Sequence, residues 1–265
     1  MTPSRAALER REHSLTDSAE GATTPSDGTV DRRSEIAANL AAVRQRIAAA
    51  CASAGRSDGG VHLIAVTKTY PAEDVLHLAA LGVHDIGENR DQEAAPKAAA
   101  VRAAGVDVRW HFVGQLQRNK ARSVATYAHL VHSVDRLPLV KALAAAVEHA
   151  GREYLDVLIQ VDLDDRVSDG DRGGAAPSDV PDLAAAIAGT GVLRVSGLMA
   201  VAPLDVPPEP AFARLAALSE ALLRDHPNAT IVSAGMSGDL EAAITHGATH
   251  VRVGTALLGK RALLG

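Results

Sequence analysis

The chain has 265 residues, so length alone permits one large domain or two small ones. Hydrophobic residues make up 47% of it, enough for a substantial core, but aromatic residues make up only 2%. Few aromatic platforms and a net charge of −5 argue against a nucleic-acid binder. No apolar run reaches the roughly 20 residues that cross a bilayer, and no leader or transit peptide is recognisable. The composition favours a soluble, cytoplasmic protein.

The first residues differ in composition from the rest of the chain. Residues 1–32 are polar, with almost no large apolar side chains, so we expect a disordered tail. Helical periodicity begins near Ser34 and continues to about Ala54. We therefore predict a tail over residues 1–32 and a single domain over residues 33–265, opening with an extra helix.

After this helix, short strand-like runs alternate with Ala-rich helical stretches. Eight strands are expected at 62–67, 84–87, 109–114, 130–133, 156–161, 194–201, 230–233 and 250–253. Helices are expected near 72–81, 90–104, 118–127, 136–150, 178–189, 209–224 and 238–246. This alternation predicts an α/β fold with a parallel sheet, and eight units favour a single (β/α)8 TIM-like barrel. A doubly wound open sheet is the alternative, because periodicity does not reveal closure.

Lys68 is the most informative residue at the strand ends, where such barrels carry their chemistry. It follows the apolar run Leu63–Val66, which would carry its amine toward the interior at the barrel mouth. Desolvation there would favour the neutral amine that forms a Schiff base with an aldehyde. A lysine in this position can also extend into solvent as an ordinary surface residue.

The ends of the last two strands are rich in small and hydroxyl residues. Ser237 with Gly238 is expected to begin one helix, and Gly254 with Thr255 another. Exposed N–H groups and hydroxyls at such turns suit a phosphate dianion, and this region of a barrel is its habitual phosphate site. The alternative is ordinary helix capping by Ser and Thr.

Two other kinds of site, a nucleotide-binding loop and a metal site, lack residues that they would require. Residues 254–260 fit the start of a Walker A loop, but Arg261 stands where Ser or Thr should bind magnesium. Cys51, the only cysteine, excludes a thiolate metal cage and is expected to be a small buried hydrophobe. His129 and His132 lie on opposite faces of a strand with no carboxylate cluster nearby. We therefore predict no metal site.

Several blocks of the chain, from about residue 34 onward, resemble the pyridoxal phosphate homeostasis protein family, single barrels related to the N-terminal domain of alanine racemases. The most specific are Trp110–Gln117 and Gly235–Ile244; shorter matches are Val66–Lys68, Gly87–Asn89, His132–Asp135, Gly197–Met199 and Val251–Thr255. The chain departs from the family pattern at Thr67 and Ala234, and its loop Asp164–Gly174 is rich in glycine and charge.

The resemblance implies pyridoxal 5′-phosphate (PLP) as cofactor and gives roles to single residues. Lys68 matches the cofactor lysine and Arg252 the arginine that faces the pyridine nitrogen. The implied phosphate-binding residues are Ser237, Gly254 and Thr255. The positions implied to line the cofactor are Asn89, His111, Ser133 and Met199.

Two functions compete: a cofactor-binding protein without turnover, and a PLP-dependent amino-acid racemase. Racemisation by two bases needs an acid or base on each face of the substrate carbon. Lys68 would serve one face, whereas none of Tyr70, Tyr127 and Tyr154 is clearly placed for the other, and no second domain is recognisable. We expect a monomeric, non-catalytic protein of vitamin B6 homeostasis, with PLP-dependent enzymes as recipients and with no nucleic-acid or membrane partner.

Overall fold

A computed structural model describes residues 31–164 and 173–259. Most of the predicted tail, most of the loop Asp164–Gly174, and Lys260 and Arg261 lie outside these ranges. Asp31 and Arg32 are the described part of the predicted tail. Arg32 is the first residue of the first helix, so this helix starts two residues earlier than expected.

Eight parallel strands within the described ranges close into a barrel, each hydrogen-bonded to the next and β8 to β1. Closure excludes the open doubly wound sheet and confirms the predicted fold class. The strands are β1 His62–Val66, β2 Asp85–Glu88, β3 Arg109–Phe112, β4 Leu130–Val134, β5 Leu155–Gln160, β6 Leu193–Met199, β7 Ile231–Ser233 and β8 His250–Val253.

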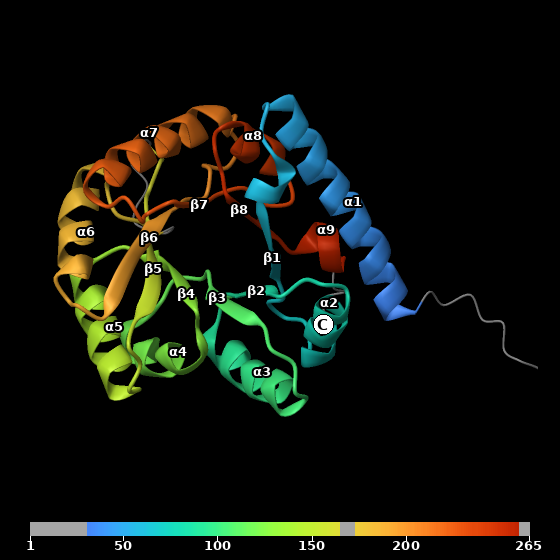
Figure 1. The fold of residues 1–265 in the computed structure, drawn as a ribbon, viewed down its shortest axis with the longest axis horizontal. Coiled ribbons are helices and arrows are strands. Elements are labelled where there is room, and N and C mark those ends of the chain that lie inside the picture. The colour runs from blue at the N-terminus through green and yellow to red at the C-terminus, as the bar shows by residue number, and fades with distance from the viewer. Residues whose placement is uncertain (1–30, 165–172, 260–265) are drawn as a thin grey trace, which may run out of the picture. The chain divides into compact units, whose positions relative to one another are not determined.

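Helices surround this barrel (Figure 1). Those of the described ranges are α1 Arg32–Ser53, α2 Ala72–Ala80, α3 Asp91–Ala103, α4 Ala121–Tyr127, α5 Leu137–His149, α6 Val180–Ala188, α7 Glu209–Asp225, α8 Leu240–Thr245 and α9 Thr255–Leu258. Single 3₁₀ turns precede α4 and α6, at Arg118–Lys120 and Pro177–Asp179. These turns explain why the sequence predicts helices that start near residues 118 and 178.

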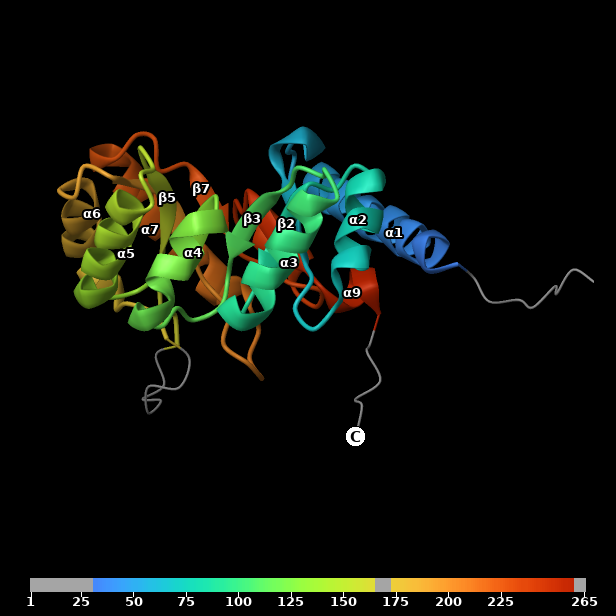
Figure 2. The same cartoon turned by 90° about the horizontal axis from the view of Figure 1, so that it is seen from below.

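The predicted extra helix, α1, packs outside the barrel against α2, α8 and α9 (Figure 2). Ile36, Leu40, Val43 and Ile47 form its buried stripe at helical spacing. Cys51 is 1% exposed and belongs to the same core, as expected of a small hydrophobe. Among the helices in the described ranges, none has the length and apolar character that crossing a bilayer requires.

The core contains mainly aliphatic side chains, because the sequence offers few aromatic ones. Phe112, Phe212 and Trp110 are buried within a large cluster of Ala, Val, Leu and Ile. Several polar side chains are also buried, among them His111, His132, Ser233 and Arg252. Buried polar groups are costly unless they are hydrogen-bonded, so their partners decide what this interior can do.

Candidate functional site

A cavity of about 620 Å³ opens at the carboxyl ends of β1, β2, β7 and β8. Six of the nine predicted site residues line it: Lys68, Asn89, Ser237, Arg252, Gly254 and Thr255. The segments that carry them are far apart in the sequence, and barrel closure brings them together. The cavity therefore joins an amine, a guanidinium and two hydroxyl side chains in one space.

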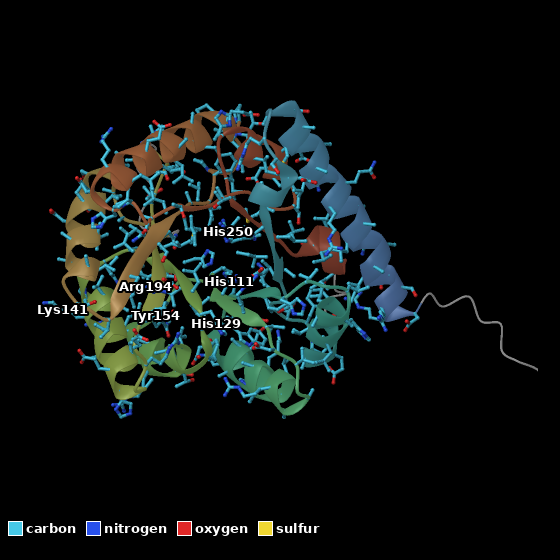
Figure 3. All side chains as sticks on the ribbon, in the orientation of Figure 1. His111, His129, Lys141, Tyr154, Arg194 and His250 are labelled. Atoms are coloured by element: carbon cyan, nitrogen blue, oxygen red, sulfur yellow. The ribbon has the colours of Figure 1, made fainter. Side chains whose placement is uncertain are left out.

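The other three predicted residues are buried away from the cavity lining. His111 lies inside the ring of strands (Figure 3) and is 5% exposed. Met199 packs with Leu130 and Leu158, and the buried hydroxyl of Ser133 has no hydrogen-bond partner among the described residues. Direct contact of these three with a cofactor stays a prediction.

Lys68 lines the cavity, but its side chain is exposed. The burial that the sequence predicted for its amine is therefore wrong, because β1 ends at Val66 and Lys68 lies in the exposed segment that follows it. The next residue, Thr69, has φ of +68°, a strained conformation for a β-branched residue. Its N–H donates to Glu93 Oε2 at 2.8 Å, and Tyr70 N–H donates to the Thr67 carbonyl at 3.0 Å. These bonds hold the strained turn that presents Lys68.

Arg252 is a buried cation at the cavity wall. Its Nη1 donates to Ser233 Oγ at 2.7 Å and its Nη2 to the Ala200 carbonyl at 2.9 Å, so both bonds go to neutral oxygens. Burial lowers the pKa of Arg252 to about 10, which leaves the guanidinium charged at neutral pH. A charge held by neutral partners can still attract an acceptor atom inside the cavity.

The predicted phosphate-binding residues lie on two adjacent turns. The Ala256 N–H donates to Ser237 Oγ at 3.3 Å, which ties the turn after β7 to the start of α9. α8 begins at Leu240, so Ser237 and Gly238 precede the helix instead of opening it as expected. A Cβ added to Gly254 would lie 3.1 Å from the Val66 carbonyl oxygen, so a side chain there would press on the end of β1.

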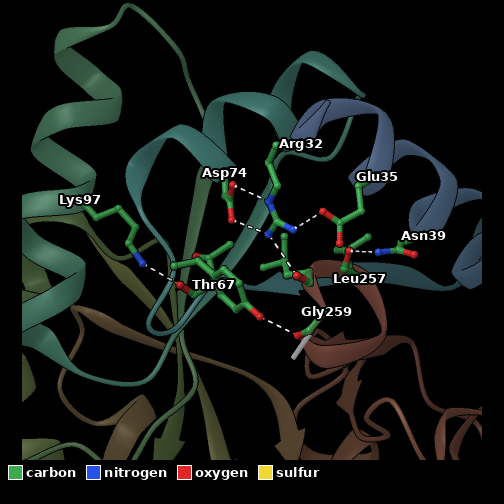
Figure 4. Close-up of polar contacts among 10 residues, drawn as sticks. Arg32, Glu35, Asn39, Thr67, Asp74, Lys97, Leu257 and Gly259 are labelled. Carbon is green, nitrogen blue, oxygen red and sulfur yellow. Dashed lines mark hydrogen bonds and ion pairs between the residues drawn. The ribbon is translucent and has the colours of Figure 1, made fainter. Parts of the chain in front are cut away.

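The carboxyl end of α9 is held by two side chains from α1 and by one from the segment between β1 and α2 (Figure 4). Asn39 Nδ2 donates to the Leu257 carbonyl at 3.1 Å, Arg32 Nη2 to the Leu258 carbonyl at 3.1 Å, and the Tyr70 hydroxyl to the Gly259 carbonyl at 2.6 Å. The last carbonyls of a helix lack partners within it, and here three in succession are satisfied. This clamp fixes α9, and with it Gly254 and Thr255, against α1 and α2.

A buried ion pair contacts Thr67, the residue that precedes Lys68. Lys97 and Glu88 pair at 7% and 1% side-chain exposure. Lys97 Nζ also donates to the Thr67 carbonyl at 2.7 Å, and Thr67 Oγ1 donates to Glu88 Oε1 at 2.5 Å. Lys97 is not among the predicted site residues, because nothing in its Ala-rich helix marks it in the sequence. Lys97, Glu88 and Thr67 together tie the end of β1 to α3.

Comparisons with known proteins agree with this architecture. A model of the family described as "Alanine racemase, N-terminal domain" matches residues 38–262. A pyridoxal phosphate homeostasis protein of Mycobacterium tuberculosis (strain ATCC 25618 / H37Rv) is 46% identical over 249 residues, 88% of this chain and 95% of that protein. One of Escherichia coli (strain K12) is 38% identical over 235 residues, 86% of this chain and 97% of that protein.

A solved structure extends the likeness to three dimensions. PipY of Synechococcus elongatus PCC7942, with PLP bound, is 32% identical, with a TM-score of 0.71. The match covers 84% of this chain and all of PipY. These matches exceed what a shared barrel fold requires and confirm the resemblance seen in the sequence. The chain belongs to the alanine racemase N-terminal domain family and, within it, to the pyridoxal phosphate homeostasis proteins.

Proposed function

We propose that this protein binds PLP as a Schiff base on Lys68 and serves vitamin B6 homeostasis without catalytic turnover. The observation that carries the proposal is the single cavity that joins Lys68, Arg252, Ser237, Gly254 and Thr255. Its donors match the ligand: an amine for the aldehyde, a cation for the ring nitrogen, and hydroxyl and N–H groups for the phosphate. When bound, PLP supplies an aldehyde that bonds reversibly to amines and a ring that can accept electrons.

Arg252 would bind the ring nitrogen as a donor only. A guanidinium at pKa about 10 keeps its protons at neutral pH, so it would hold that nitrogen unprotonated. An unprotonated ring withdraws electrons less strongly, which lowers reactivity at the substrate carbon. Racemases tolerate such an arginine, so the choice between a holding role and catalysis depends on the second face of the site.

The tyrosines favour the holding role. Tyr70 lines the cavity, but its hydroxyl proton is donated to the Gly259 carbonyl. Tyr127 Oη donates to Asp91 Oδ1 at 3.3 Å, and burial, together with Asp91, raises its pKa above the usual range. Tyr154 directly precedes β5, and the centroid of its ring lies 3.1 Å from the guanidinium carbon of Arg194. Racemisation needs a free acid or base opposite Lys68, and none of the three offers one.

The rim of the cavity bears on release of the cofactor. Lys68, Thr255, Val201 and Met236 are exposed there. Water that hydrolyses the Schiff base would return the Lys68 amine, and the freed aldehyde could then leave across this exposed rim. We therefore propose transfer of PLP to PLP-dependent enzymes in the cytoplasm, by a monomeric carrier that binds neither nucleic acid nor membrane.

A chirality assay tests the function against the racemase alternative. Purified protein loaded with PLP should leave L-alanine and other amino acids enantiomerically unchanged over hours at high protein concentration. Turnover of about 1 s⁻¹, the low end of ordinary enzymes, would contradict the proposal. Tyr70→Phe would then show whether Tyr70 is the second base.

The phosphate-binding residues are tested by a double substitution. Ser237→Ala with Thr255→Ala should remove two hydrogen bonds to a dianion, each worth roughly 1.5–3 kcal/mol. Titration should show much weaker binding of PLP and little change for unphosphorylated pyridoxal. Equal losses for both ligands would mean that the two side chains serve only the fold.

A further inference from the structure

A line of hydrogen bonds runs through the barrel interior, and we call it the polar column: Arg252, Ser233, His132, His111 and Asp85. Arg252 Nη1 donates to Ser233 Oγ at 2.7 Å, and Ser233 Oγ lies 3.0 Å from His132 Nδ1. His132 Nε2 lies 3.0 Å from His111 Nδ1, and His111 Nε2 lies 2.9 Å from Asp85 Oδ1. Each member therefore bonds to the next without a gap.

The two ends of the polar column face different cavities. Arg252 lines the candidate PLP cavity at the carboxyl ends of the strands. Asp85 is the first residue of β2 and lines a cavity of about 330 Å³ with Arg44, His62 and His84. The column thus joins the PLP cavity to the amino-terminal mouth of the barrel.

The donors and acceptors of the column fit one proton order. Arginine only donates and an ionised carboxylate only accepts, so the two ends fix the direction of the bonds when both imidazoles are neutral. His111 must donate from Nε2 to Asp85, which leaves its Nδ1 to accept from His132 Nε2–H. His132 Nδ1 then accepts the Ser233 hydroxyl proton, and Ser233 Oγ accepts from Arg252. Every proton in the line has an acceptor when both imidazoles are neutral.

The charges around the column are consistent with this order. Burial would raise the pKa of Asp85, but hydrogen bonds from His111 and Arg109 outweigh it and keep that pKa below its usual value. Burial holds the pKa of His132 well below its usual value, and the charge of the Arg252 guanidinium lowers it further. A charged His132 would donate to Ser233 and leave the serine proton without an acceptor in the column.

We propose that Ser233, His132, His111 and Asp85 are positioning residues that hold the Arg252 guanidinium in the orientation required by PLP. This inference rests on the proposed PLP site and adds that the orientation of Arg252 depends on residues as distant as Asp85. Bonded groups ordered in one direction polarise one another, so a break at any point weakens the bond to Arg252. The buried His111 then acts through Arg252 instead of touching the cofactor.

The column is tested first in the unloaded full-length protein. Nitrogen-15 NMR of the imidazoles at pH 7 should show His132 neutral, with its proton on Nε2. Ser233→Ala should speed the exchange of the Arg252 guanidinium protons with solvent by about ten-fold. This factor corresponds to the free energy of one ordinary hydrogen bond. A proton on His132 Nδ1, a charged His132, or unchanged exchange would overturn the proposal.

Loaded protein supplies the second test. His132→Leu and Ser233→Ala should each weaken PLP binding by about ten-fold and shift the absorbance of the bound cofactor. His132→Gln keeps one acceptor and one donor, so it should restore both properties toward wild type. Ser196→Ala, a strand serine that bonds Asp156 outside the column, should change neither. Wild-type affinity and absorbance in the Ser233→Ala variant would refute the positioning role.

The two hypotheses can fail separately. If wild-type protein bound no PLP, the proposed function would be wrong. The imidazole and guanidinium measurements would still show whether the column has the proposed proton order and holds Arg252. If His132→Leu did not fold, as its thermal unfolding would reveal, Ser233→Ala and His132→Gln would carry the test.

Discussion

Replacing Lys97 by methionine is expected to lower the free energy of unfolding by about 3–5 kcal/mol, a large effect for one side chain. Lys97 neutralises the buried carboxylate of Glu88 and donates to the Thr67 carbonyl. Methionine fills a similar volume but leaves Glu88 as a buried charge with only the Thr67 hydroxyl as donor. Chemical denaturation monitored by circular dichroism measures the loss.

The loss should also depend on pH in a defined direction. Burial already raises the pKa of Glu88, and removing Lys97 raises it further. A carboxyl whose pKa is higher in the folded state binds its proton more tightly there. The Lys97→Met variant should therefore lose stability as pH rises from about 4.3, the ordinary pKa of glutamate, toward the raised value.

Two further variants control this prediction. Lys97→Met with Glu88→Gln removes both charges. The double variant should recover much of the stability and should lose the pH dependence that Lys97→Met introduces, because glutamine does not titrate. Arg90→Met removes a pair with Glu93 whose atoms lie 3.7 Å apart and whose arginine is 75% exposed, so it should cost less than about 1 kcal/mol. Equal stabilities for Lys97→Met and Arg90→Met would show that the buried pair contributes little.

The fold could be predicted because its determinants are local. Alternating apolar runs and Ala-rich periodic stretches mark strands and helices, and eight repeats suggest closure. The errors are small and have physical causes. α1 begins at Arg32 because that side chain pairs with Asp74 at 2.7 Å and donates to the Leu258 carbonyl, partners far away in the sequence.

The candidate site could be predicted only in part. Lys68, Ser237, Gly254 and Thr255 follow strand ends, so their neighbourhood follows from the topology of the barrel. The partners of Arg252 could not be predicted in this way, because inward-facing residues of different strands meet only once the barrel closes. Those of Lys97 could not be predicted because they depend on how α3 packs against the ends of β1 and β2. His132 illustrates this: its spacing from His129 excluded a metal site but gave no indication of Ser233, which is 101 residues away in the sequence.

Lys68→Ala is expected to abolish covalent attachment of PLP. Alanine offers no amine, whereas Arg252, Ser237 and Thr255 remain to bind the cofactor non-covalently. After borohydride reduction, the adduct should fall to background in this variant. Lys141→Ala is the matched control, because Lys141 is exposed on α5 on the outside of the barrel (Figure 3), and it should retain the full adduct.

Mapping the reduced adduct on wild-type protein tests the central claim most directly. The chain contains five lysines, Lys68, Lys97, Lys120, Lys141 and Lys260, so peptide mass spectrometry can distinguish them. Purified protein incubated with PLP and reduced with borohydride should carry one pyridoxyl group, on the peptide that contains Lys68. No pyridoxyl group, or one located mainly on another lysine, would contradict the assignment of this cavity as the PLP site.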